Sequence, residues 1–196
     1  CLIKMVRAYA IAFAAVLSVS AGAQTKQTAA TRAIDKYVKS VEALTGSRTQ
    51  PDVVTADTAD ADADKPDWKH FGSPAELDKA REEKETYTIA FNWKRNGRIV
   101  ASNFTFFSPS GDWSQYVFHF FRSDGTLARV DAELRTFMDD CVIKQKFYFD
   151  RGGKRLRKTL AYFDLNTNKP NRRCLGADAL KFDYYRSSAK LPFPML

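Results

Sequence analysis

Apolar and polar residues alternate over residues 87–94 (YTIAFNWK), which gives this stretch a hydrophobic period of two. That period is typical of a β-strand with one buried face. Asn96 and Gly97 follow directly, and this pair favours a two-residue hairpin turn because both positions tolerate positive φ angles. The alternation resumes over residues 100–106. The pattern therefore predicts a β-hairpin at this point.

The same turn signal recurs twice at equal intervals. Asp124-Gly125 and Gly152-Gly153 follow Asn96-Gly97 at steps of 28 residues. An aromatic residue precedes each turn at the same distance: Trp93, Phe121 and Phe149. We predict three hairpins in series, which form a curved antiparallel β-meander of about six strands in a mainly β (α+β) fold. Residues 129–137 (RVDAELRTF) fit a helix as well as a strand, and the sequence leaves both open.

The units around these turns, FNWKRNGRIV, FFRSDGTLARV and FYFDRGGKRLRK, resemble the hairpins of bacterial MORN-type repeat proteins, in which an aromatic residue precedes a glycine turn. The resemblance covers only these three stretches, and the 28-residue interval is longer than the interval of those repeats. It implies hairpins in series, and we transfer no function, cofactor or site residue from it.

One or two helices are predicted before the hairpins and are expected to pack on the sheet. The first lies within residues 24–46, where apolar residues recur at steps of four and three and Thr31 is a suitable N-cap. Its stripe consists of Ala33, Tyr37, Val41 and Leu44. The second begins at Ser73, Pro74 and Glu76, which have the spacing of a capping box with proline in the first turn.

Residues 47–69 are expected to form a flexible acidic linker. Most of this stretch is low-complexity Thr, Ala and Asp, with few apolar groups whose burial would offset the entropy cost of ordering. Its DTADADAD run lacks the glycine and the distal glutamate of a calcium-binding loop. Residues 70–196 are then the antiparallel β domain, with residues 179–185 as a candidate edge strand.

Residues 1–23 read as a signal peptide with a few upstream residues. Met5 and Arg7 precede an apolar run over residues 8–19, and Ala21-Gly22-Ala23 is a typical signal-peptidase site. The run is shorter than the ~20 residues that span a bilayer. We therefore expect export to the periplasm or the cell exterior after cleavage near Ala23, and no transmembrane segment in the mature chain.

Two cysteines remain after that cleavage, Cys141 and Cys174. An even pair in an exported chain is typical of a disulfide, and two buried thiols are the alternative. Cys141 stands beside Asp139 and Asp140, whose negative charges would raise the pKa of a free thiol. A cysteine nucleophile is therefore disfavoured.

The chain has 196 residues and a formal charge of +8, with 44% hydrophobic residues. That balance excludes a wholly disordered, collagenous or coiled-coil chain. The positive charge concentrates in the third hairpin, and we expect its basic side chains to form one face with an aromatic residue. The candidate binding residues are Lys144, Lys146, Tyr148, Arg155 and Arg157. Such a face suits an anionic envelope glycan or lipid, whereas nucleic acid is disfavoured for an exported protein. A solvated sheet face whose lysines discourage edge pairing is the favoured alternative.

Catalytic signals are weak. His70 and His119 are the only histidines, and His119 is interpreted as a strand residue. No nucleophile elbow, zinc-protease, P-loop or dinucleotide-binding motif is present, so we predict no cofactor and no metal. The carboxylates of the β region leave acid–base chemistry open. They are Asp112, Asp124, Asp131, Glu133, Asp139 and Asp140.

These observations favour an exported, non-catalytic binding or scaffold protein that uses the basic aromatic face. The alternative is a half-barrel that carries a lipid or another apolar ligand, because adjacent aromatic residues such as Phe120 and Phe121 make both faces of the sheet apolar. A hydrolase that uses paired carboxylates is the third hypothesis.

Overall fold

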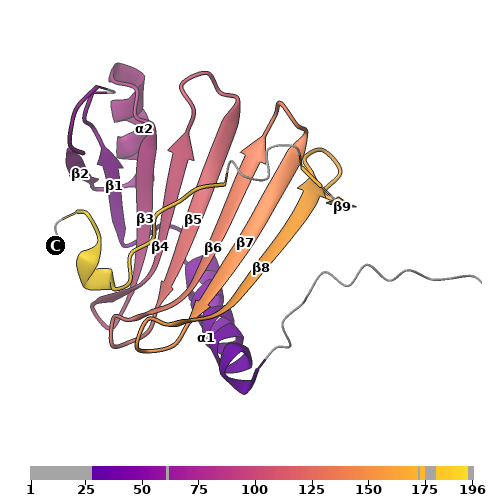
Figure 1. Cartoon of the computed structure of the whole chain (residues 1–196). Coiled ribbons are helices and arrows are strands. Elements are labelled where there is room, and N and C mark those ends of the chain that lie inside the picture. The colour runs from indigo at the N-terminus through magenta and orange to yellow at the C-terminus, as the bar shows by residue number, and fades with distance from the viewer. Residues whose placement is uncertain (1–27, 61, 172, 175–179, 194–196) are drawn as a thin grey trace, which may run out of the picture.

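The chain folds into one open antiparallel sheet with both α-helices on one face and a short 3-10 helix, Ser188–Lys190, in the C-terminal segment. The computed structural model describes residues 28–60, 62–171, 173–174 and 180–193. The nine strands follow the order β2-β1-β3-β4-β5-β6-β7-β8-β9 (Figure 1). The α-helices are α1 (Ala29–Ser47) and α2 (Pro74–Glu83). The strands are β1 (Val53–Asp57), β2 (Trp68–Phe71), β3 (Thr88–Arg95), β4 (Arg98–Phe107), β5 (Trp113–Phe121), β6 (Leu127–Thr136), β7 (Cys141–Phe149), β8 (Arg155–Asp164) and β9 (Pro170–Asn171).

The predicted hairpins are β3–β4, β5–β6 and β7–β8, each paired antiparallel. Each one contains a β-bulge near its turn, where the pairing register shifts. The residues that the register leaves without a partner are Val100, Ala128 and Leu156, again 28 residues apart. The sequence interval therefore reflects a repeated strand–turn–bulge unit, and the meander around it has more strands than the six expected.

The first turn differs from the other two by one residue. Asn96 and Gly97, both at positive φ, form a two-residue turn between β3 and β4. In the second hairpin Arg122 N–H donates to the Thr126 carbonyl, which leaves residues 123–125 in the loop. The extra loop residue shifts the strand positions by one relative to the turn, and a shift of one residue moves a side chain to the other face. The aromatic residues before the three turns therefore do not all lie on the same face. Trp93 packs beside Phe118 towards α1, whereas Phe121 and Phe149 belong to the core on the opposite face.

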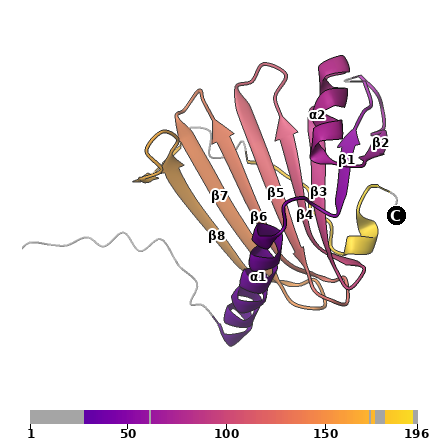
Figure 2. The ribbon, with the colours of Figure 1, turned by 180° about the vertical axis from the view of Figure 1, so that it is seen from behind.

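Helix α1 crosses the sheet on what we call the helix face (Figure 2). It begins earlier than the sequence pattern indicated, because Thr28 rather than Thr31 caps it, with the Thr28 hydroxyl accepting from the Thr31 N–H. Residues 24–27 of the expected helix lie outside the described residues. Ile34, Val38 and Val41 are the buried apolar residues of α1. They belong to one cluster with Val100 and Ala128, the residues at the bulges of the first two hairpins.

Helix α2 covers the other end of the same face (Figure 2). Ser73 caps it as predicted, since its hydroxyl accepts from the Glu76 N–H, and the Glu76 carboxylate accepts from the Gly72 N–H. Leu77 is its buried anchor and packs in one cluster with Val54 and Ile89. The helix face is thus covered by α1 over the central strands and by α2 over β1 and β3.

Residues 47–69 are not a linker, which corrects the prediction. Strand β1 lies within them and pairs with both β2 and β3. Val53, Val54, Thr55 and Ala56 are buried there. Val53, Val54 and Thr55 are β-branched and have high β propensity, and the acidic composition of the neighbouring loop concealed them. Residues 129–137, open between helix and strand, belong mainly to β6.

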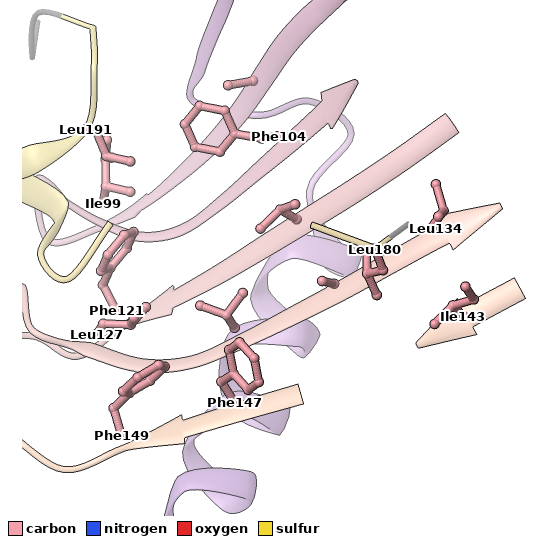
Figure 3. Close-up of a cluster of buried hydrophobic side chains, with 14 of the residues drawn as sticks. Ile99, Phe104, Phe121, Leu127, Leu134, Ile143, Phe147, Phe149, Leu180 and Leu191 are labelled. Carbon is pink, nitrogen blue, oxygen red and sulfur yellow. The ribbon is translucent and has the colours of Figure 1, made fainter. Parts of the chain in front are cut away.

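The face opposite the helices, here the pocket face, is crossed by residues 180–193, which we call the C-terminal strap (Figure 1). Leu180, Leu191 and Phe193 of the strap are buried in the main core cluster with aromatic and aliphatic side chains of β4 to β7 (Figure 3). The disulfide Cys141–Cys174 ties the segment before the strap to the start of β7. In the described part of the chain the last strand is β9, and residues 180–185 of the candidate edge strand 179–185 have no strand pairing.

Candidate ligand-binding pocket

A cavity of about 700 Å³ lies between the pocket face and the C-terminal strap. That volume is within the range of small-molecule sites in proteins. Strands β4, β5 and β6 form its floor, and the strap forms its cover. Strand β2 and the β6–β7 turn also contribute lining residues. The lining residues are Trp68, Phe104, Phe106, Trp113, Gln115, Val117, His119, Leu134, Thr136, Met138, Asp139, Lys181, Phe182, Asp183 and Tyr185.

Aromatic contacts give the cavity a rigid apolar wall. The Phe104 ring lies edge-on to Trp68 with centroids 5.7 Å apart, and it stacks on Tyr185 of the strap at 5.4 Å. Phe104 also lies 6.0 Å from Phe193, so a single β4 side chain contacts both the middle and the C-terminal end of the strap. Aromatic residues lose few rotatable bonds on ordering, so the wall is pre-formed for an apolar ligand.

His119 is buried in the cavity floor, with 1% of its surface exposed. Its Nε2 accepts a hydrogen bond from the Tyr185 N–H at 3.3 Å, so the neutral ring carries its proton on Nδ1. Burial lowers the pKa of His119 to about 4. The ring is therefore neutral at physiological pH and accepts a hydrogen bond from the strap backbone.

Polar groups at the rim also hold the strap. Gln115 Nε2 donates to the Lys181 carbonyl at 3.1 Å. At the other end of the strap, Leu127 N–H donates to the Arg186 carbonyl at 3.0 Å, and Ser188 N–H donates to the Gly125 carbonyl at 2.9 Å. The strap is thus fixed to the sheet on both sides of the cavity. Between these anchors Phe182, Asp183 and Tyr185 line the cavity.

The basic residues of the third hairpin do not form one free face. Lys144 and Lys146 of β7 lie directly opposite Glu133 and Asp131 of β6. Their ammonium groups are 3.1 Å and 3.4 Å from those carboxylates. These two acidic residues were candidates for acid–base chemistry from the sequence, and the strand register makes them ion-pair partners of the lysines.

Tyr148 lies beneath α1, with 4% of its surface exposed, and burial raises its pKa to about 12. Beside it the guanidinium of Arg129 bonds to Asp131 at 2.7 Å and to Asp35 of α1 at 2.8 Å. The Arg129 guanidinium carbon also lies 5.0 Å from the Phe120 ring centroid. These contacts make Tyr148 part of the junction between α1 and the sheet and leave little of it for an external partner.

Arg155 and Arg157 lie on opposite faces. Arg157 pairs with Tyr148, and its guanidinium carbon lies 5.7 Å from the Tyr148 ring on the helix face. Arg155 pairs with Phe149 and lies 5.3 Å from the ring of Phe147, which is a pocket-face residue. The bulge at Leu156 separates them, because an inserted residue reverses the alternation that the sequence analysis had assumed to be ideal.

The candidate carboxylates have structural partners. Asp124 accepts from the Thr126 hydroxyl and backbone N–H within its turn, and these bonds lower its pKa. Asp131 and Glu133 are ion-paired. Among the described residues, no group of three or more His, Cys, Asp or Glu side chains is placed to ligate a metal ion. Neither described helix is long and apolar enough to cross a membrane.

Comparison of the chain with protein-family models, curated proteins and solved structures finds no match. The assignment of the pocket as a candidate site therefore rests on its geometry alone. The sequence analysis missed Trp68 and Tyr185 as site residues, since they come from a supposed linker and from a supposed edge strand. Alternation in β4 and β5 did place Phe104, Val117 and His119 on defined faces, but only the strap shows which face forms a cavity.

Proposed function

We propose that this protein is an exported, non-catalytic binding protein that holds an apolar ligand between the pocket face of its sheet and the C-terminal strap. The observation that carries the proposal is the cavity of about 700 Å³ with its aromatic wall. Two of its polar lining side chains hold the strap, His119 through the Tyr185 N–H and Gln115 through the Lys181 carbonyl. The other polar lining residues are Thr136, Asp139, Lys181 and Asp183. An apolar ligand gains free energy there by leaving water.

The basic face is the weaker hypothesis for binding. Lys144 and Lys146 are already paired with carboxylates, Tyr148 is buried, and Arg155 faces the other way. An anionic polymer would have to displace Glu133 and Asp131 before it gained the lysines. Solvent-exposed ion pairs contribute little to stability, so breaking them is not the main obstacle. The obstacle is that the displaced carboxylates keep their negative charge and repel an anionic polymer. We therefore place the ligand on the pocket face.

Export is supported by two features of the chain. The disulfide Cys141–Cys174 joins segments 33 residues apart, and disulfides persist mainly in oxidising compartments. The predicted signal peptide, residues 1–23, lies outside the described residues and stays a prediction. An exported protein with a largely apolar cavity is suited to keep a poorly soluble molecule out of water.

Filling the cavity tests the proposal. The variant Val117→Phe adds a ring to the cavity floor, and Thr136→Phe adds one at its edge. The dye phenylnaphthylamine fluoresces strongly in apolar sites, and the wild type is expected to bind it. We expect either variant to bind the dye roughly tenfold more weakly, a loss of about 1.4 kcal/mol.

The matched control is Ala161→Phe, which adds the same ring to the exposed helix face of β8. It should bind the dye like the wild type. Circular dichroism and thermal unfolding establish that all three variants fold. Dye binding that is unchanged in both cavity variants, or lost equally in the control, contradicts a ligand in this pocket.

A further inference from the structure

Large apolar side chains are exposed at the end of the sheet where the pocket opens. Met138, Phe137 and Trp113 are 84%, 58% and 39% exposed. Phe137 and Met138 belong to the β6–β7 turn, and Trp113 begins β5 after the β4–β5 turn. The two turns lie at the same end of the sheet (Figure 1), and Phe137 N–H donates to the Asp112 carbonyl at 3.0 Å. We call these three apolar residues the apolar tip.

The apolar tip is continuous with the cavity. Trp113 and Met138 both line the pocket as well as facing solvent. An apolar surface thus runs from the aromatic wall outwards to the end of the molecule. Along such a surface an apolar ligand stays in contact with apolar side chains on its way into the pocket. Clustered exposed apolar side chains in soluble proteins commonly mark a contact site.

The chemistry of the apolar tip fits a lipid bilayer. Tryptophan and phenylalanine on protruding turns insert between lipid headgroups, and methionine adapts its shape to a fluid surface. Two adjacent turns at one end of the sheet can reach a flat surface together. Apolar molecules suit the cavity, and a bilayer holds such molecules in its hydrocarbon core.

The charges near the apolar tip indicate which kind of bilayer it contacts. Asp112, Asp139 and Asp140 stand in the same two turns, so the surroundings of the apolar tip are acidic. An anionic membrane would repel these carboxylates, whereas a zwitterionic membrane presents no net charge. We infer that the apolar tip, formed by Trp113, Phe137 and Met138, docks on a zwitterionic bilayer, from which the pocket takes up its ligand. The uptake rests on the proposed function, and the docking does not.

Vesicle sedimentation tests the inference. Sucrose-loaded vesicles of phosphatidylcholine are pelleted with the full-length mature protein, and bound protein is measured in the pellet. The double variant Phe137→Ser/Met138→Ser removes the two most exposed apolar groups without touching the core. We expect it to bind about tenfold or more weakly than the wild type, since each buried apolar side chain contributes substantially to the transfer.

The matched control is Leu160→Ser on β8, where the leucine is 44% exposed but does not line the cavity. This variant should bind vesicles like the wild type. Replacing part of the phosphatidylcholine with phosphatidylglycerol should weaken binding of the wild type. The inference is overturned if the wild type does not pellet with phosphatidylcholine vesicles, if the double variant pellets equally well, or if anionic vesicles bind more tightly.

The dye titration separates docking from ligand binding. Both proposals hold if the wild type binds the dye and the vesicles, and if the single variant Phe137→Ser, which lies outside the pocket lining, keeps the dye and loses vesicle binding. A wild type that binds the dye but not the vesicles overturns the docking and leaves the pocket. A wild type that binds vesicles through the apolar tip but not the dye overturns the pocket and leaves the docking.

Discussion

At the scale of single residues, His119 shows how a buried polar group serves packing. Its imidazole accepts from the strap backbone and lies 5.5 Å from the Phe104 ring centroid and 5.8 Å from that of Phe121. Burial lowers its pKa to about 4, from an ordinary value near 6.5 in the unfolded chain. Because the unfolded chain takes up a proton first as the pH falls, this residue makes stability depend on pH.

The variant His119→Gln should remove that dependence. Above about pH 6.5 the histidine is neutral in both states and has no effect on the pH profile. Between about pH 6.5 and pH 4 it lowers the free energy of unfolding by about 3 kcal/mol in total, and below pH 4 the effect levels off. Glutamine retains an acceptor for the Tyr185 N–H without titrating.

Urea unfolding at a series of pH values measures the difference. All other groups titrate alike in the two proteins, so subtraction isolates His119. Parallel pH profiles for the wild type and His119→Gln would show that the ring is not held neutral in the folded protein.

At the scale of elements, the strap is the part of the fold that makes the pocket. It contributes three buried core residues, Leu180, Leu191 and Phe193, and is held by hydrogen bonds to β5 and to the β5–β6 turn. The disulfide at Cys174 restrains the chain just before it. Without that restraint the unfolded chain gains entropy, and the strap becomes easier to detach.

Reduction of the disulfide should therefore destabilise the protein by about 3 kcal/mol on the chain-entropy account. Thermal unfolding of the wild type with and without dithiothreitol measures this effect. The double variant Cys141→Ala/Cys174→Ala serves as control and should not respond to the reductant. A wild-type melting temperature that dithiothreitol leaves unchanged would contradict a stabilising bond between these two cysteines.

The hairpins were predictable because turns impose local chemistry. Gly125 and Gly153 adopt positive φ, and glycine is the residue that does so without strain. The equal intervals then predicted strand pairs that the structure contains. Strand β1 was not predictable from its composition, since Val53 to Ala56 is a short apolar stretch within acidic low-complexity sequence. Only its pairing partners distinguish it from a linker.

The candidate site was less predictable than the fold. Ideal alternation placed Arg155 beside Arg157, and a one-residue bulge at Leu156 separates them. The lysines of β7 were correctly recognised as basic, but their ion pairs depend on the register between β6 and β7. The pocket depends on a further layer, because the strap reaches the sheet from far along the chain. Hydrophobic periodicity reports on residues that are close in sequence, whereas these contacts join residues that are far apart in the chain.

At the scale of the whole molecule, the two faces of one sheet have different covers. The helix face is closed by α1 and α2, with Arg129 joined to Asp35 of α1 across the junction. The pocket face is covered by the strap, which spans a cavity instead of filling it. The formal charge of +8 gives no guide to the site, because neighbouring strands pair acidic with basic side chains.

The most direct measurement of this account locates a bound apolar probe. A long-chain alcohol that carries a nitroxide label is added to isotope-labelled protein, and paramagnetic broadening of methyl resonances is recorded. The account predicts broadening of Val117 and Leu134 on the pocket face, while Val38 and Val41 of α1 stay sharp. Broadening centred on α1, or broadening spread evenly over the molecule, would contradict a ligand held between sheet and strap.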